Sequence, residues 1–274
     1  MAETPKLGIC RLCKANETLV KSHLIPKGFY KKITPTNQGA TILTREKTFT
    51  SSRQMQDELL CLECENRFSI RENYVLSITP QLDGKFPLRD WLKHAKLITE
   101  VHGGLALEGD SVSALNVEQL AYFAASVFWR GSAHYWQCYG RKVNSGKLGE
   151  KYDEQFRRFL LGQLSFPNDA RLIVIAGNSD KPTMALSHPV RGRREGYYIH
   201  RFSVPGIQFL LQIGQRVPKD SENCCIVHSP KHTIFLGSWD QEFMLSDMRM
   251  LAITSEQSMK LKQEMRCLAP VRDE

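Results

Sequence analysis

Residues 59–72 read LLCLECENRFSIRE, and residues 10–13 read CRLC. Each stretch contains a Cys-x-x-Cys pair, a spacing that lets both sulfur atoms of the pair reach one metal ion from a tight turn. Thiolates are soft ligands that suit Zn²⁺, and four of them complete a closed tetrahedral site. We therefore predict a structural zinc ion held by Cys10, Cys13, Cys61 and Cys64.

The first 80 residues are predicted to form a zinc-binding module. This part of the chain has few large apolar side chains, so a bound metal would supply much of its folding free energy. Scattered buried thiols and a redox dithiol are the alternatives for these cysteines. No thioredoxin-like βαβ pattern surrounds either pair, which disfavours the redox alternative.

The composition is that of a globular protein rather than a disordered, fibrous or membrane-spanning one. Hydrophobic residues make up 42% of the 274 residues and charged residues 24%. No apolar run approaches the roughly 20 residues that a membrane helix needs, and the N-terminus has no apolar segment typical of a secretion signal. We expect a cytoplasmic protein without membrane contact. The formal net charge of +8 suits a polyanionic partner but does not require one.

Residues 81–274 are predicted to form an α+β body. Asn116 is a candidate helix N-cap with Gln119 three residues later, and apolar residues then recur at helical spacing from Leu120. Residues 149–164 predict a second amphipathic helix, and residues 87–101, PLRDWLKHAKLITEV, predict a short one.

The chain beyond Pro167 has the pattern of short strands separated by turn residues, which favours a mainly antiparallel sheet. Six runs carry this pattern: ARLIVIAG, TMALSHPV, GYYIHRFSV, IQFLLQIG, NCCIVHS and HTIFLGSW. The basic stretch 191–196, RGRREG, is interpreted as a turn between two of them. The tail, residues 240–268, is predicted to be helical.

Residues 22–26 read SHLIP and place His23 ten residues beyond Cys13. Together with LLCLECEN, this order of segments resembles the zinc-stapled HNH nucleases, whose finger has a treble-clef or ββα-metal fold. It also resembles uncharacterised bacterial HNH-like proteins in which SHIIP and LLCxxCE segments precede an α+β body with Trp-Arg in a central helix. SVFWRGS, residues 126–132, agrees with that last feature.

The resemblance implies hydrolysis of phosphodiester bonds in DNA, with His23 as the general base. A neutral imidazole can accept a proton from water near pH 7. The residue after the last cysteine, Glu65, is in the position of a ligand to a catalytic divalent ion. Asp57 and Glu72 are further candidates, and Glu72 shares a helix face with Glu65. Such oxygen ligands suit Mg²⁺ or Mn²⁺.

This chain departs from the family pattern at three positions. Ser22 stands where an acidic residue often precedes the histidine, Gln56 or Asp57 stands near the usual asparagine, and Glu65 replaces a histidine or asparagine. A histidine in a zinc module also serves in packing or hydrogen bonding, and helix carboxylates serve in salt bridges.

Basic residues around the predicted finger are candidates for contacts with DNA phosphates, or belong to a solvated face. They are Lys21, Lys27, Lys31, Lys32 and Arg67. Arg130 and His134 are four residues apart in an aromatic helix, where the arginine would bind a phosphate or carboxylate or form a buried ion pair.

Two hypotheses of function follow. The first is an HNH-like, metal-dependent DNA endonuclease, for which the resemblance suggests bacterial antiphage defence as a setting. The second is a non-catalytic zinc-stapled module that binds nucleic acid or protein. In the first, the body, residues 81–274, would supply DNA contacts, a partner interface or ligand sensing. In the second, the body itself would carry the function. A protein partner or a homo-oligomer contact would be formed through the body.

Overall fold

The computed structural model describes residues 6–34, 40–43, 47–138, 141–143, 146–238 and 256–257. The predicted helical tail, residues 240–268, falls outside these ranges except for residues 256–257.

The N-terminal part is a small antiparallel sheet followed by a long helix. Three strands form the sheet in the order β1-β2-β5: β1 (Lys6–Ile9), β2 (Asn16–His23) and β5 (Gln56–Cys61). Helix α2 (Leu62–Ile78) begins directly after β5, and α1 (Lys27–Ile33) follows β2. We call β1, β2, β5 and α2 the finger. Between α1 and β5, β3 (Ala40–Leu43) and β4 (Lys47–Ser51) pair with each other, and β15 (Glu256–Gln257) joins β4.

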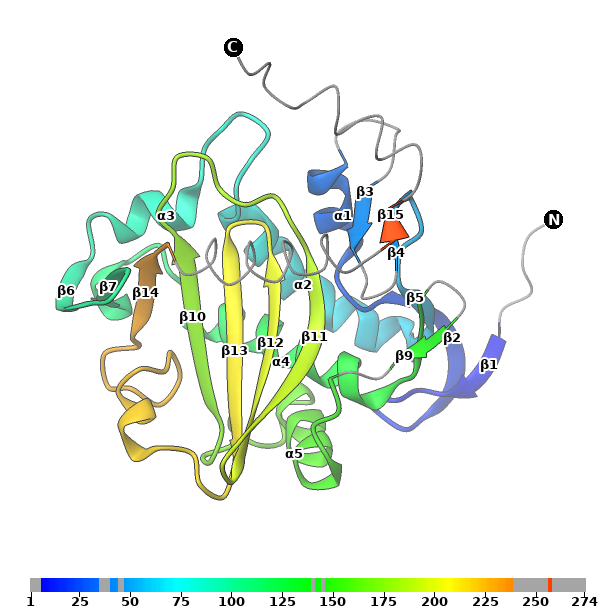
Figure 1. Cartoon of the computed structure of the whole chain (residues 1–274). Coiled ribbons are helices and arrows are strands. Elements are labelled where there is room, and N and C mark those ends of the chain that lie inside the picture. Colours follow the sequence, from blue (N-terminus) through cyan, green and yellow to red (C-terminus); the bar gives the residue numbers. More distant parts are fainter. Residues whose placement is uncertain are drawn as a thin grey trace, which may run out of the picture.

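The body is built on a seven-stranded sheet (Figure 1). Its strands are β6 (Lys96–Val101), β7 (Gly104–Glu108), β10 (Arg171–Gly177), β11 (Ser187–Arg194), β12 (Tyr197–Val204), β13 (Ile207–Gly214) and β14 (Ile234–Gly237). Their order is β11-β12-β13-β10-β14-β7-β6. All neighbouring pairs are antiparallel except β10 and β14, which are parallel.

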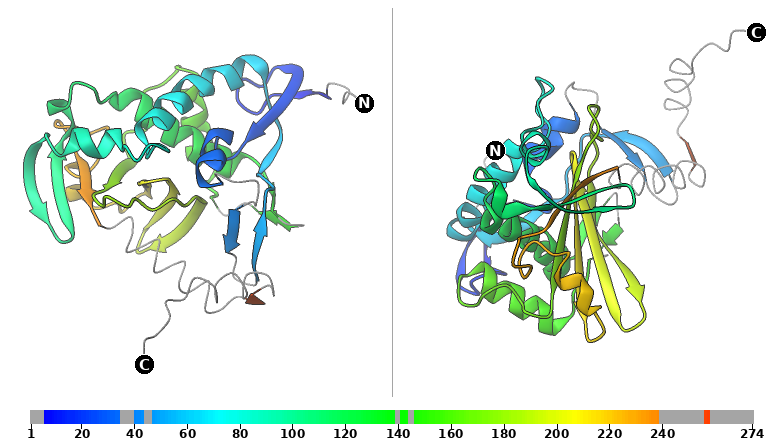
Figure 2. Two further views of the ribbon diagram at one scale, coloured as in Figure 1. Left: turned by 90° about the horizontal axis from the view of Figure 1, so that it is seen from above. Right: turned by 90° about the vertical axis from the view of Figure 1, so that its left-hand side faces the viewer.

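Helices cover one face of this sheet, as the edge-on view in Figure 2 shows. Helix α4 (Val117–Ala133) packs on the sheet through Phe123 and Phe128, whose rings meet those of Phe202 on β12. Helix α5 (Glu150–Leu160) and the finger helix α2 pack against α4. The remaining elements are α3 (Pro87–Leu92), the hairpin β8 (Trp136–Cys138) and β9 (Arg141–Val143), and the 3₁₀ turns η1 (Gly109–Ser111) and η2 (Lys219–Glu222).

The buried core runs without a break from the finger into the body. The ring of Phe29 on α1 lies 5.7 Å from that of Phe123, and Phe68 on α2 lies 6.4 Å from Trp129 on α4. Finger and α4 therefore share one core, which matters for the site described below. The division of the chain into residues 1–80 and 81–274 stays a prediction.

The structure confirms the predicted α+β fold class, and Asn116 caps α4 by accepting a hydrogen bond from the Gln119 N–H. Three local predictions were wrong. The helix predicted over residues 87–101 extends only through α3, and residues 96–101 form the strand β6. NCCIVHS is not a strand, because the N–H groups of Cys224 and Cys225 close turns onto Ser221 and Glu222.

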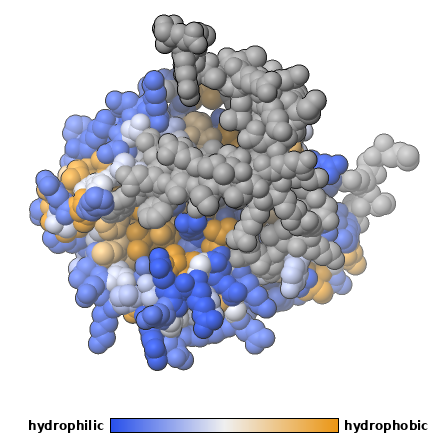
Figure 3. Space-filling model, viewed as in Figure 1, coloured by the Kyte–Doolittle hydropathy of each residue, from blue (hydrophilic) through white to orange (hydrophobic). Residues whose placement is uncertain are grey.

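The third wrong prediction concerns the basic stretch 191–196, most of which continues strand β11 as far as Arg194. Only Glu195 and Gly196 form the turn into β12, and Gly196 adopts φ +82° there. The side chains of Arg193 and Arg194 are exposed. Hydrophilic residues dominate the lower part of the face seen in Figure 3.

Candidate functional site

The four predicted zinc ligands converge in the finger. Their sulfur atoms all lie within 4.8 Å of one another, and the Sγ atoms of Cys13 and Cys61 are 3.8 Å apart. Four sulfurs at about 2.3 Å from a tetrahedral zinc ion would be separated by about 3.8 Å. The donor set and its spacing therefore fit a metal ion such as zinc.

The local backbone explains how the two cysteine pairs meet. Cys10 and Cys13 bracket a tight turn in which Lys14 adopts φ +67° and donates its N–H to the Cys10 carbonyl. The Arg11 N–H donates to the Leu59 carbonyl, which ties this turn to β5. Cys61 ends β5 and Cys64 lies in the first turn of α2.

The electrostatics of the cluster also suit a cation. Hydrogen bonding between the Cys10 and Cys64 sulfurs lowers the pKa of Cys10 and raises that of Cys64. Four thiols this close cannot all ionise without a positive charge among them, because like charges disfavour one another. A metal ion would allow all four to become thiolates.

Glu65 follows the last cysteine and points back to strand β2. Its Oε2 accepts a hydrogen bond from the buried Ser22 hydroxyl at 2.7 Å. Burial raises the pKa of Glu65, while the Arg130 charge and the Ser22 hydrogen bond oppose that rise. The Ser22 hydroxyl thus fixes the orientation of the carboxylate.

Arg130 of α4 connects the body to the finger. Its side chain is fully buried, and its Nη1 donates to the His23 carbonyl oxygen at 2.6 Å. Its Nη2 forms an ion pair with Glu72 Oε1 at 2.7 Å, and its Nε donates to the Ser126 carbonyl. The guanidinium carbon also lies 5.2 Å from the centre of the Phe68 ring. One side chain therefore holds the end of β2 and the middle of α2 together.

A second connection joins His134, just after α4, to Asp57 on β5. The His134 Nε2 donates to Asp57 Oδ2 at 2.8 Å. Burial alone would raise the pKa of Asp57, but hydrogen bonds from His134 and from the Glu58 N–H outweigh it and leave the pKa lowered. The His134 ring packs edge-on against Trp136, with the ring centres 5.1 Å apart. Carboxylate and aromatic ring together fix the orientation of this imidazole.

His23 ends strand β2, and its backbone pairs with Gln56 in β5. Its side chain is partly buried. Burial lowers the pKa of His23, a hydrogen bond with Gln54 opposes this, and the charges of Arg130 and Lys27 lower it further. A lowered pKa favours the neutral ring, which is the form that can accept a proton.

The carboxylates and histidines near the finger do not form a ready three-ligand metal site. Within the described ranges, the cysteine cluster alone brings three or more His, Cys, Asp or Glu ligand atoms within 4.8 Å of one another. Glu72 is engaged by Arg130, Glu65 by Ser22 and Asp57 by His134.

The predicted phosphate-binding residues differ in their surroundings. Lys21, Lys27 and Lys31 are exposed. The Lys32 ammonium donates to the Leu76 and Pro80 carbonyls and to Thr79 Oγ1, so it closes the C-terminal end of α2. Arg67 binds the Leu161 carbonyl and Glu63. These contacts favour structural roles for Lys32 and Arg67.

Comparison with protein families, curated proteins and solved structures finds no match for this chain. Among the described residues, none of the helices combines the length and the hydrophobicity that crossing a lipid bilayer requires.

Sequence reasoning did not include Arg130 and His134 among the site residues, although their spacing and aromatic setting stood out. Both lie in the body, yet they contact the finger. The sequence did contain one indication that Arg130 contacts another element, namely its position within an otherwise apolar helix. A guanidinium buried there needs a carboxylate partner.

Proposed function

We propose that this protein is an HNH-like, metal-dependent endonuclease that hydrolyses phosphodiester bonds in DNA. The observation that carries the proposal is the position of His23 at the end of β2, in the finger that brings the four cysteines together, where Arg130 fixes its backbone. Burial also lowers the pKa of His23. A general base must be held in position and be unprotonated near the working pH. The SHLIP and LLCLECEN segments supply the resemblance to the nuclease family.

In this proposal His23 accepts the proton of the water that attacks phosphorus, and the bond from phosphorus to the leaving oxygen breaks. His134 is the candidate proton donor to that oxygen through Nδ1, because its Nε2–H is held by Asp57 and Asp57 pairs with Ser22, the residue before His23. Exposed Lys27 and Lys31 contact neighbouring phosphates.

Glu65 and Asp57 would hold Mg²⁺ or Mn²⁺, and Glu72 is the weaker candidate because Arg130 already neutralises it. Mg²⁺ is commonly bound through one or two carboxylates together with water and substrate phosphates. When bound, it would stabilise the negative charge that develops on the phosphate.

The alternative is a zinc-stapled module that binds nucleic acid or protein without catalysis. One observation favours it: Glu65, Asp57 and Glu72 each already have a partner inside the protein. The pairs Arg130–Glu72 and His134–Asp57 join the finger to the body, a role that needs no catalysis.

The test is cleavage of supercoiled plasmid with Mg²⁺ or Mn²⁺ by the zinc-loaded parent, by His23→Ala and by a control, His94→Ala, which alters an exposed histidine. We expect the control to match the parent and His23→Ala to be slower by about 100-fold or more. DNA binding is measured in parallel by fluorescence anisotropy.

Equal cleavage by the parent and His23→Ala would contradict the role of His23. Binding without cleavage would favour the alternative. The antiphage setting is tested by plaque counts on bacteria that express the parent or His23→Ala, and equal counts would argue against it.

A further inference from the structure

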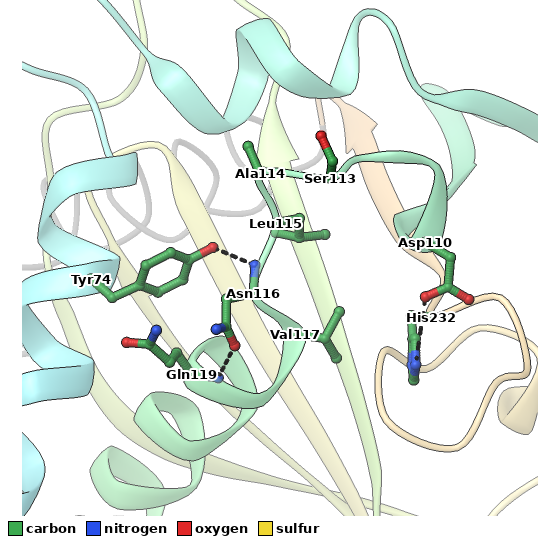
Figure 4. A pocket seen from close by; sticks show the side chains of 9 residues that line it. All are labelled: Tyr74, Asp110, Ser113, Ala114, Leu115, Asn116, Val117, Gln119 and His232. Atoms are coloured by element: carbon green, nitrogen blue, oxygen red, sulfur yellow. Dashed lines mark hydrogen bonds and ion pairs between the residues drawn. The ribbon is translucent and has the colours of Figure 1, made fainter.

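A polar pocket lies where the loop after β7 enters helix α4. Its volume is about 510 Å³. In Figure 4 Asp110 and His232 lie together on one side of the pocket, and Tyr74, Asn116 and Gln119 lie on the other. None of these residues belongs to the site described above.

The backbone brings Asp110 and His232 together by an unusually close approach of two loops. The Gly109 N–H donates to the Lys231 carbonyl at 3.0 Å. A Cβ atom on Gly109 would lie 2.4 Å from the His232 carbonyl oxygen, so a side chain cannot be accommodated at this position. The glycine therefore permits the contact, and Asp110 follows it directly.

His232 is held in a conformation that few non-glycine residues adopt, with φ +46°. Its Nδ1 lies 2.8 Å from the Ile226 carbonyl oxygen. A carbonyl only accepts hydrogen bonds, so Nδ1 carries the proton and the opposite nitrogen, Nε2, faces Asp110. The distance from Nε2 to Asp110 Oδ1 is 3.6 Å.

This separation is too long for a good hydrogen bond. In the neutral imidazole, the Nε2 lone pair would oppose a carboxylate unless a positive charge lies between them. Two ligand atoms bonded to one ion at about 2.0–2.2 Å are separated by roughly 3–3.8 Å. Histidines that bind metals commonly donate their other ring N–H to a backbone carbonyl, as His232 does to Ile226.

An ion pair between Asp110 and His232 without a metal ion does not account well for the left-handed backbone of His232. Asp110 and His232 are 51% and 36% exposed, and ion pairs with such exposure contribute little to stability. A non-glycine residue in the left-handed conformation destabilises the fold by at least as much as such an ion pair stabilises it. The conformation persists because the surrounding structure imposes it.

We propose that Asp110 and His232 bind one divalent transition-metal ion, at a site separate from the four cysteines. An imidazole nitrogen with a carboxylate oxygen suits Zn²⁺, Co²⁺, Ni²⁺ or Cu²⁺. The remaining coordination positions face the pocket and take water or an anionic group of a bound molecule. The site does not depend on nuclease activity.

The test is calorimetric titration of Ni²⁺ into protein that already carries one equivalent of zinc at the cysteines. We expect the parent to bind one Ni²⁺ and both His232→Asn and Asp110→Asn to weaken that binding at least tenfold. Asparagine tolerates the left-handed conformation, so His232→Asn keeps the backbone. His102→Asn, at an exposed histidine in the β6–β7 turn, is the matched control and should bind Ni²⁺ like the parent.

Absence of Ni²⁺ binding by the parent would overturn the proposal, and so would unchanged affinity in His232→Asn. A zinc assay after the titration shows whether the cysteine site kept its metal. Displacement of that zinc with no further Ni²⁺ bound would also overturn it.

Discussion

Replacing Arg130 by methionine would remove the charge that joins the body to the finger while keeping a long side chain in its place. The substitution leaves the Glu72 carboxylate, whose side chain is 13% exposed, without its partner. It also removes the donor to the His23 carbonyl oxygen. Glu72 and His23 are both partly buried, so water cannot fully replace the lost contacts.

The expected loss of unfolding free energy in Arg130→Met follows from the low exposure of Arg130 and Glu72. Removing one partner of a buried ion pair costs about 3–5 kcal/mol of unfolding free energy, because the other charge stays uncompensated. Glu72→Leu should cost a comparable amount for the same reason. In the double variant both charges are gone, and the unpaired His23 carbonyl leaves a residual loss of about 1–3 kcal/mol. The two substitutions should therefore be strongly non-additive.

The assay is urea unfolding at pH 7.5 with zinc present, followed by tryptophan fluorescence and by circular dichroism. The parent, the two single variants and the double variant form a double-mutant cycle. Arg158→Met serves as the control because Arg158 is exposed on α5, and we expect it to change stability by no more than about 0.5 kcal/mol.

Two results would refute this reasoning. One is a loss below about 1 kcal/mol for Arg130→Met, the range of an exposed ion pair. The other is a double variant whose loss equals the sum of the two single losses, which would mean that the residues do not interact.

Three further predictions concern stability. Cys64→Ser, or treatment with a strong zinc chelator, should unfold the finger, seen as lost circular dichroism and one equivalent of released zinc; retained structure would contradict a structural metal. Burial lowers the pKa of His200 to about 4, so the folded state binds fewer protons than the unfolded state and stability should fall by about 3 kcal/mol between pH 6.5 and 4. His200→Leu should show less of this loss than the parent in urea unfolding, and an identical pH dependence would refute it. Lys32→Met should lower the unfolding free energy by about 1–3 kcal/mol by removing three hydrogen bonds at the end of α2, whereas the exposed Lys31→Met should not.

The parts of the fold that were predictable rest on short-range patterns. The two cysteine pairs, the Asn116 cap and the alternation in β10, β12 and β13 each depend on residues a few positions apart. The errors arose where two local patterns compete. Residues 96–101 form a strand although they directly follow the helix α3 and show no strict polar–apolar alternation. Residues 223–229 contain the apolar run 224–227, but the N–H groups of Cys224 and Cys225 close turns.

The sequence by itself identified the four thiols that could hold a metal ion, because Cys-x-x-Cys spacing lets both sulfurs of a pair reach one ion from a turn or from the start of a helix. It also identified His23 and Glu65 as polar residues beside those thiols. Tertiary structure alone decided which residues of the body contact the polar residues of the finger. Arg130 reaches His23 across 107 residues of chain, and His134 reaches Asp57 across 77. A buried charge must find an opposite charge, but the chain has 29 acidic residues, and only packing of α4 against the finger selects Glu72 for Arg130.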